Sequence, residues 1–307
     1  MPGQIRIDSR VVLVKVETVY NTDSVPTNTT NAVRLMNVKP SFFEGDVIET
    51  DELGLGMGQS TKDLVGRYGT LEFDVELQSS GAAGTSPAMG PLLRACSMAE
   101  TITAATKVEY TPIGAAQESV SIYNWSGINK TVFTGGRGDA QLTYDKNKKA
   151  KIHFKLWGLF VSEAAVAQPV PTLTAWKRAL YCTNANVVYT LDGTAVIANS
   201  LTFSLGNACR YLERMGRQEI VIDDRNPAFQ TVIEDVSIAT KNWRTLVNGA
   251  SAALSHQIGN VAGSIVLLTA GACQLQPLSD DADGVDTMLN MNWNVLRGSP
   301  DFTLCFK

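Results

Sequence analysis

Three carboxylates stand at every second position of one short segment of the sequence. Glu72, Asp74 and Glu76 alternate with apolar residues through positions 71–77. A β-strand has a side-chain period of two, so this pattern places the three acids on one face and the apolar residues on the other. Acids side by side on an open strand face are solvated and lack the desolvation that tunes a catalytic pKa. The segment therefore predicts either an ordinary solvated face or a surface that repels a polyanion and lets it move.

The other residue types that could perform chemistry do not form a recognisable site. The two histidines, His153 and His256, fall in different halves and have no acid or cysteine at metal-ligand spacing. The five cysteines are scattered and include no CxxC pair, which argues against a disulfide framework and a zinc site. Motifs for nucleophilic serine, zinc-protease, phosphate-loop or dinucleotide chemistry are absent from the sequence. We expect no enzyme activity, no metal and no cofactor.

The charge and hydrophobicity of the sequence argue against a nucleic-acid-binding protein and against a membrane-spanning one. The 307 residues carry 26 Lys and Arg against 30 Asp and Glu, a net charge of −4, so no basic surplus is present to grip a phosphate backbone. No apolar run approaches the roughly 20 residues that cross a bilayer, and the first residues lack the apolar stretch of a signal peptide. We expect a chain made and folded in the cytoplasm, with no membrane insertion.

Short alternating segments dominate the sequence and predict a mainly β fold. The clearest cases are residues 11–17, 71–77, 150–157 and 201–205, separated by Gly, Asn, Asp and Pro. Two segments look helical instead. Residues 90–99 have a proline near their start and residues 239–249 end in Asn-Gly, as helix boundaries prefer.

An Ala- and Pro-rich segment divides the chain into two halves of similar organisation. Residues 163–174 are expected to be a linker between a first domain, residues 1–162, and a second, residues 175–307. Each half has an early strand, a polar loop, an acid-bearing strand, a short helix, a strand pair and a closing strand with one tryptophan, Trp157 or Trp293. This order of elements predicts an internal duplication.

Several motifs taken in order resemble one family. The segment 16–26 (VETVYNTDSVP) is followed by 37–40 (NVKP), 43–46 (FEGD), 71–77 (LEFDVEL) and 90–96 (GPLLRAC). Weaker matches follow at 204–207, 222–227 and 301–307. This set resembles the major tail tube protein of siphophages, the bacteriophages with long, non-contractile tails. The second half departs from the single-domain pattern of many members, so the chain looks like two tube domains in tandem.

The resemblance implies a fold and an assembly. The fold is two tandem β-sandwich domains, each with a short α-helix, whose sheets join those of neighbouring subunits into a ring-shaped β-barrel. If family rings hold six tube domains, two domains in each chain imply a trimer with pseudo-sixfold symmetry. A hexamer is the alternative if the second half is an external decoration.

The resemblance also implies a function. The chain is expected to polymerise into stacked rings that form the tail tube, the conduit for DNA ejection into the host, in the virion after assembly in the host cytoplasm. Expected partners are other copies of the chain, the tape-measure protein, the tail terminator and distal tail proteins, while DNA passes without specific binding. The alternatives are the inner tube of a contractile tail or related injection apparatus and, less favoured, an immunoglobulin-like binding module.

Two groups of residues are candidates for this function. Glu72, Asp74 and Glu76, with Glu234 on the matching strand of the second half, are expected to face the lumen. Contacts between subunits or rings are expected from an N-terminal arm and from a long loop over residues 46–67, which is rich in glycine and has no core-like pattern. The contact candidates are Gln4, Ile5, Arg6, Asp46, Gly54, Gly56, Gly58, Gln59 and Arg67.

Overall fold

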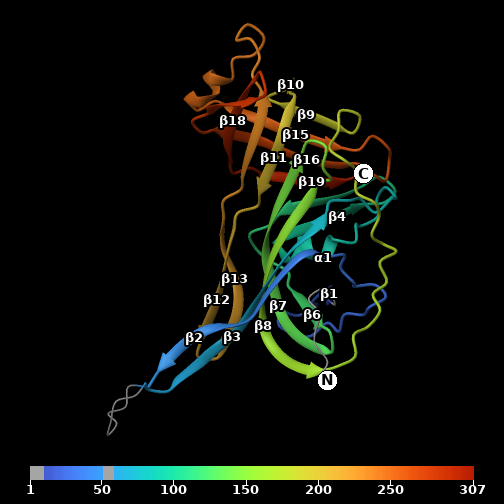
Figure 1. Ribbon diagram of the computed structural model, residues 1–307, viewed down its shortest axis with the longest axis vertical. Helices are drawn as coiled ribbons and strands as arrows, with labels where there is room; N and C mark the ends of the chain where they lie inside the picture. The colour runs from blue at the N-terminus through green and yellow to red at the C-terminus, as the bar shows by residue number, and fades with distance from the viewer. Residues whose placement is uncertain (1–9, 51–58) are drawn as a thin grey trace.

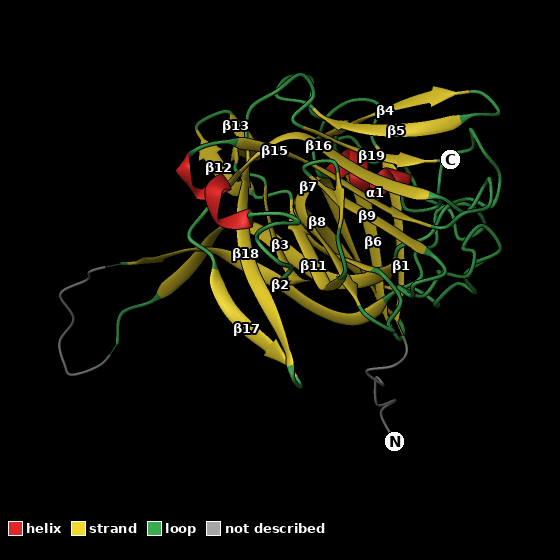
Figure 2. Cartoon of the chain, turned by 90° about the horizontal axis from the view of Figure 1, so that it is seen from above, coloured by secondary structure: helices red, strands yellow, loops and turns green. Residues whose placement is uncertain are grey.

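The computed structural model describes residues 10–50 and 59–307. Within these residues the chain is mainly β, with two short helices and large antiparallel sheets, as the alternating sequence pattern predicts (Figures 1 and 2). The alternation is directly visible in the third strand, where Leu71, Phe73 and Val75 are buried and the intervening acids are only partly covered.

The described part of the first half contributes eight strands and one helix. They are β1 (Arg10–Val16), β2 (Met36–Glu49), β3 (Lys62–Glu76), α1 (Gly90–Ala95), β4 (Met98–Thr103), β5 (Lys107–Pro112), β6 (Val120–Ser126), β7 (Asn129–Asp145) and β8 (Lys151–Ala165). The helix has Pro91 in its first turn, where the missing amide hydrogen costs nothing, and buries Leu92 and Leu93 in the core.

The second half contributes the remaining elements. They are β9 (Val187–Leu191), β10 (Thr194–Ala195), β11 (Ala198–Ser204), β12 (Asn207–Arg214), β13 (Arg217–Arg225), β14 (Ala228–Glu234), the 3₁₀ helix η1 (Trp243–Asn248), β15 (Ser251–Ile258), β16 (Val266–Leu275), β17 (Ser279–Asp283), β18 (Asp286–Val295) and β19 (Phe302–Phe306). A long irregular connection after β8 runs along the body to β9 (Figure 1).

One antiparallel sheet runs through both halves. Its strand order is β2-β3-β8-β7-β11-β14-β18-β17, and the two halves meet where β7 pairs with β11. Further strands join this sheet because β6 pairs with β7 and β16 pairs with β18. β1 then pairs with β6, β9 with β15, and β19 lies between β16 and β5, while β12 and β13 form a separate two-stranded sheet. The β19–β5 pairing joins the two halves a second time.

The core is also shared between the halves. A single cluster of buried side chains includes Phe73 and Phe154 of the first half and Phe203, Phe229 and Trp293 of the second. Phe229 stacks on Trp293 with ring centroids 5.6 Å apart, and Phe203 meets the edge of Phe302 at 5.0 Å. Burial of aromatic rings of this size is the dominant stabilising contribution in such a core.

Two expectations about local structure need correction. The loop expected over residues 46–67 is a long hairpin, because β2 continues to Glu49 and β3 begins at Lys62, so that Asp46 and Arg67 both lie in strands. The helix expected over residues 239–249 is reduced to the 3₁₀ turn η1, which Asn242 caps through its side chain and Gly249 ends with a positive φ of 92°.

The matching of Trp157 with Trp293 is also wrong in detail. Trp157 lies on the partly exposed face of β8, with the Lys155 ammonium 5.2 Å from its ring, whereas Trp293 is completely buried in β18. A shift of one residue along a strand moves a side chain to the opposite face. Leu156 of β8 is the residue that corresponds to Trp293. It is buried and pairs with Leu71 of β3, just as Trp293 pairs with Phe229 of β14.

Candidate functional site

The sheet that crosses both halves presents one polar face, formed by the outward residues of its strands. Directly opposed residues in antiparallel strands share a face, so the registers connect the side chains of successive strands into continuous rows. One such row runs from Asp74 through His153, Gln141, Ser204 and Ala228 to Asn294. The opposite face of the same strands is buried core. We call the outward side the polar face.

The three predicted acids lie together on the polar face, but each is paired with a base. Glu72 accepts from the Lys155 ammonium at 2.8 Å, and Glu76 from Lys149 at 2.6 Å. Asp74 lies 2.8 Å from the Nδ1 of His153 and 3.8 Å from the Lys151 ammonium. The acidic strand is therefore part of a charge-balanced surface, which the sequence alone did not reveal because the bases belong to β8 and its preceding turn.

The pairs of Glu72 and Asp74 hold these two carboxylates in their ionised form. The hydrogen bond from Lys155 lowers the pKa of Glu72 below its ordinary value. Partial burial acts to raise the pKa of Asp74, but hydrogen bonds from Asn37 and His153 outweigh it and the pKa is lowered. A carboxylate with a lowered pKa gives up protons readily, so neither acid is suited to act as a general acid near neutral pH.

The second half contributes neutral groups to the polar face. Its outward residues are Ser200, Thr202 and Ser204 on β11, Gln230 and Val232 on β14, and Asn290, Asn292 and Asn294 on β18. Glu234 lies at the end of β14, on this same face, opposite Met288. The structure thus brings Glu234 to the same face as the three acids of β3, several strands away.

Both ends of this sheet are strand edges within the described residues. There, β2 pairs with β3 alone and β17 pairs with β18 alone. The free side of an edge strand presents unpaired N–H and C=O groups, which are a template for pairing with another chain. Pro40 lies in β2, and proline is tolerated in sheets mainly at such edges.

The outer part of the β2–β3 hairpin projects away from the body (Figures 1 and 2). We call residues 43–50 and 59–68 the arm. Its apolar side chains are unusually exposed: Phe43 by 54%, Val47 by 62%, Ile48 by 55% and Val65 by 40%. Of the predicted contact residues, Asp46, Gln59 and Arg67 are exposed on the arm, while Gly54, Gly56, Gly58, Gln4, Ile5 and Arg6 lie outside the described residues.

A second hairpin, β12–β13, extends from β11 and β14 and lies against the first half (Figure 1). The Ile220 carbonyl accepts from Arg137 at 2.8 Å, and the Ile220 amide donates to the Tyr20 hydroxyl at 2.7 Å. Tyr211 stacks on Tyr68 with ring centroids 4.8 Å apart. This docked hairpin is absent from the expectations above, although the polar, alternating segment 207–225 with Gly216 at its centre is a signal for it.

The order of strand pairing is the same in the two halves. The first half pairs in the order β1-β6-β7-β8-β3-β2, and the second in the order β9-β15-β16-β18-β14-β11. These strands also follow the same order along the chain, with the short helix between the third and fourth in each case. The β2–β3 hairpin and the hairpin that carries β12–β13 therefore occupy corresponding places.

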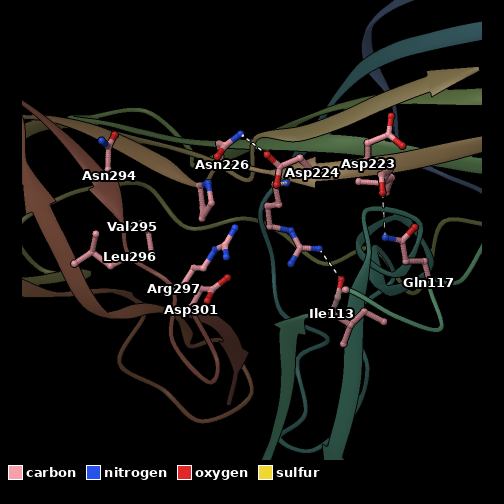
Figure 3. Close-up of a pocket in the computed structure, with 14 residues that line it drawn as sticks. Ile113, Gln117, Asp223, Asp224, Asn226, Asn294, Val295, Leu296, Arg297 and Asp301 are labelled. Carbon is pink, nitrogen blue, oxygen red and sulfur yellow. Dashed lines mark hydrogen bonds between the residues drawn. The ribbon is translucent and has the colours of Figure 1, made fainter.

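A hollow of about 600 Å³ lies at the junction of the halves. Figure 3 shows Arg297 and Asp301 of the loop after β18 on one side and Ile113 and Gln117 of the first half on the other. Arg225 bridges the junction by donating to the carbonyls of Ile113 at 2.9 Å and Ser97 at 3.0 Å. Its guanidinium is thus committed to holding the halves together, and the hollow is best described as an inter-half groove.

His256 lies in a buried aromatic cluster at the edge of a smaller cavity of about 240 Å³. Its ring centroid is 4.2 Å from that of Tyr144 and 5.3 Å from that of Tyr189. Its Nδ1 and the Tyr144 hydroxyl have no hydrogen-bond partner among the described residues. Burial lowers the pKa of His256 to about 4, so the ring is neutral at pH 7.

We expect His256 to make the folded chain sensitive to acid. An unfolded histidine has its usual pKa near 6.5, so between that pH and about 4 the unfolded chain binds a proton that the folded chain does not. Stability is full above pH 6.5 and falls by up to about 3 kcal/mol as the pH drops to 4. His256→Leu should remove this part of the pH dependence, as measured by urea unfolding at pH 7 and 4.5. His153→Gln serves as the control, and equal pH dependence in wild type and His256→Leu would contradict the assignment.

The described residues contain no group of three or more His, Cys, Asp or Glu side chains that could hold a metal ion. Within the same residues, no helix has the length and apolarity needed to span a membrane. Comparison of the sequence with protein-family models gave no match, and a search of curated proteins found no relative.

Proposed function

We propose that this chain is a tube-forming structural protein of a phage tail, of the kind found in long, non-contractile tails. It assembles into rings that stack into a conduit for DNA. The observation that carries the proposal is the sheet β2-β3-β8-β7-β11-β14-β18-β17, which has one polar face, one core face and two unpaired edges in the described chain. A curved sheet with these properties can close through copies of itself, and closure removes the exposed edges.

The repeated pairing order supports two tandem tube domains in each chain. Each half contributes four strands to the shared sheet, so three copies make a wall of twenty-four strands with pseudo-sixfold symmetry. The trimer follows from the second half lying in the same sheet as the first, at the β7–β11 pairing. A hexamer of chains is the alternative in which the second half lies outside the wall.

The polar face is the proposed lumen wall, lined by Glu72, Asp74, Glu76 and Glu234. Tight DNA binding requires lysines or arginines free to replace the counterions of the phosphates. Lys149, Lys151 and Lys155 on this face are each within 4 Å of a carboxylate, and the second half adds amides and hydroxyls. Repulsion by a charge-balanced wall is weaker than repulsion by bare acids, so we attribute free passage of DNA to the lack of available cations.

The remaining partners follow from this assignment. The arm and the N-terminal residues are proposed to contact neighbouring subunits or rings. The tape-measure protein and DNA occupy the lumen, while tail terminator and distal tail proteins bind the ends of the tube. The work of the protein is mechanical and electrostatic, without a catalytic step.

Negative-stain electron microscopy of the purified chain across a concentration series tests the proposal. We expect hollow tubes of uniform diameter above a critical concentration. A chain that stays monomeric at every concentration would overturn the tube assignment and favour the immunoglobulin-like binding module instead.

A further inference from the structure

The junction between the two halves of the chain provides a template for the junction between chains. This inference rests on the proposed ring. In the chain, the outer strand of the first half, β7, pairs with the first sheet strand of the second half, β11. At the open ends of the sheet, β2 corresponds to β11. The counterpart of β7 is β16 together with β17, which continues β16 along β18. The same pairing repeated between copies joins β17 of one chain to β2 of the next.

The alignment of the two halves is fixed by hydrogen bonds at the end of the sheet. The Leu77 amide donates to the Ala150 carbonyl at 2.9 Å, directly after β3. The Asp235 amide donates to the Thr287 carbonyl at 2.9 Å, directly after β14. Counting back from these bonds aligns the buried pair Leu71–Leu156 with the buried pair Phe229–Trp293, so the core faces of the two halves also agree.

This alignment gives a register for the junction between chains. Thr202 of β11 lies opposite Gln230, as Lys39 of β2 lies opposite Glu72, so Thr202 corresponds to Lys39. On the other strand, Thr143 lies opposite Lys151, as Asp281 lies opposite Met288, so Thr143 corresponds to Asp281. Because Thr143 and Thr202 are directly opposed within the chain, the template places Asp281 of one copy opposite Lys39 of the next.

The charges at these two positions are complementary, and Lys39 also faces Glu72 of β3 within its own chain. Lys39 and Asp281 are both exposed, and neither forms an ion pair within the described residues. Their neighbours are already engaged: Glu72 with Lys155, Asp280 with Arg244 at 3.6 Å, and Asp283 with Lys146. The lysine and the aspartate that the register brings together are thus both without an ion pair in the described chain.

We propose that copies of this chain join head to tail through antiparallel pairing of β17 with β2, in the register that sets Asp281 against Lys39. Opposite charges directly across two strands stabilise the pairing, and like charges oppose it. Pro40 removes one ladder hydrogen bond and β17 is only five residues long, features that limit uncontrolled pairing of these edges in the monomer. The ion pair therefore selects the register rather than supplying most of the binding free energy.

Charge reversal tests the register. Lys39→Asp and Asp281→Lys, each alone, should raise the critical concentration for tube formation at least about fivefold at low salt. The double variant with both changes restores the pair at every junction and should return to the wild-type value. Lys39→Asp combined with Asp280→Lys is the matched control: it has the same net charge, but residue 280 points to the opposite face, so it should not rescue.

Mixing the two single variants tests the number of chains in the ring at the same time. Every favourable junction then joins one variant to the other, so the two variants must alternate around the ring. Only a ring with an even number of chains can alternate throughout. A ring of three retains one unfavourable junction. The critical concentration for tube formation should therefore be higher for the mixture than for the double variant. Full recovery in the mixture would contradict the ring of three.

A disulfide gives an independent readout. Directly opposed residues in antiparallel strands have Cα atoms about 4.5–5.5 Å apart, within the range of a disulfide. Lys39→Cys with Asp281→Cys should yield covalent trimers on a non-reducing gel after oxidation, whereas Lys39→Cys with Ala282→Cys should not. Normal tubes without cross-linking and without charge rescue would overturn the register and leave the tube function standing. Absence of tubes from the wild-type chain would overturn the function as well.

Discussion

Replacing Phe203 with alanine is expected to destabilise the folded chain by about 3 to 5 kcal/mol, the range measured for phenylalanine truncation in tightly packed cores. Phe203 is completely buried, meets Phe302 edge to face at 5.0 Å, and lies on β11, the strand that joins the two halves. The truncation removes core contacts at the place where the first and second halves share one sheet. Urea unfolding followed by circular dichroism measures the effect.

The shape of this unfolding curve is as informative as its midpoint. Because β11 is bonded to β7 on one side and β14 on the other, we expect the halves to lose structure in one transition. Phe43→Ala is the control, since Phe43 is 54% exposed on the arm and its loss should change stability by less than about 0.5 kcal/mol. A loss below 1 kcal/mol in Phe203→Ala, or two separate transitions in the wild type, would contradict a shared core.

Shortening the arm is expected to abolish tube formation while leaving the monomer folded. Asp46 and Val65 are paired across the hairpin, so residues 47–64 can be replaced by an Asn-Gly turn that joins these two positions. The deletion removes the exposed Val47 and Ile48 and the predicted contact residues Gly54, Gly56, Gly58 and Gln59, and none of the described residues it removes belongs to the buried core. Thermal unfolding and electron microscopy of the same preparation separate folding from assembly.

The β12–β13 hairpin offers a control for the arm experiment. Met215 is fully exposed at its tip, yet this hairpin already lies against its own chain through Ile220 and Tyr211. Met215→Ser should therefore leave tubes unchanged. Normal tubes from the chain with the shortened arm would show that the arm is dispensable for assembly and would remove it from the proposed contacts.

The sequence predicted the elements that depend on local alternation. Segments 71–77 and 201–205 lie in β3 and β11 except for their last residues, because their apolar residues recur at the period of a strand. The sequence predicts a loop for the outer part of the arm because its strands have no core face: Val47 and Ile48 are neighbours in sequence and both are exposed. A strand of this kind is stabilised by pairing with the other strand of its hairpin. The hydrophobic periodicity of a single segment does not reveal that pairing.

The sequence predicted that the three acids share one face, but it did not predict the bases that pair with them. Alternation put Glu72, Asp74 and Glu76 on one face, which the structure confirms. The bases that neutralise them come from sequence positions 149–155, and only the β3–β8 register brings Lys155 beside Glu72 and His153 beside Asp74. The matching of Trp157 with Trp293 failed because a single-residue offset, small in an alignment, reverses the face of a strand.

The most direct test of the account is a cryo-electron microscopy reconstruction of the assembled tube, with the mass of one ring measured independently. The account predicts three chains in each ring, a wall of twenty-four strands, and Glu72, Asp74, Glu76 and Glu234 facing the lumen. Six chains in each ring, with the second half outside the wall, or a wall whose polar face points outward, would contradict it.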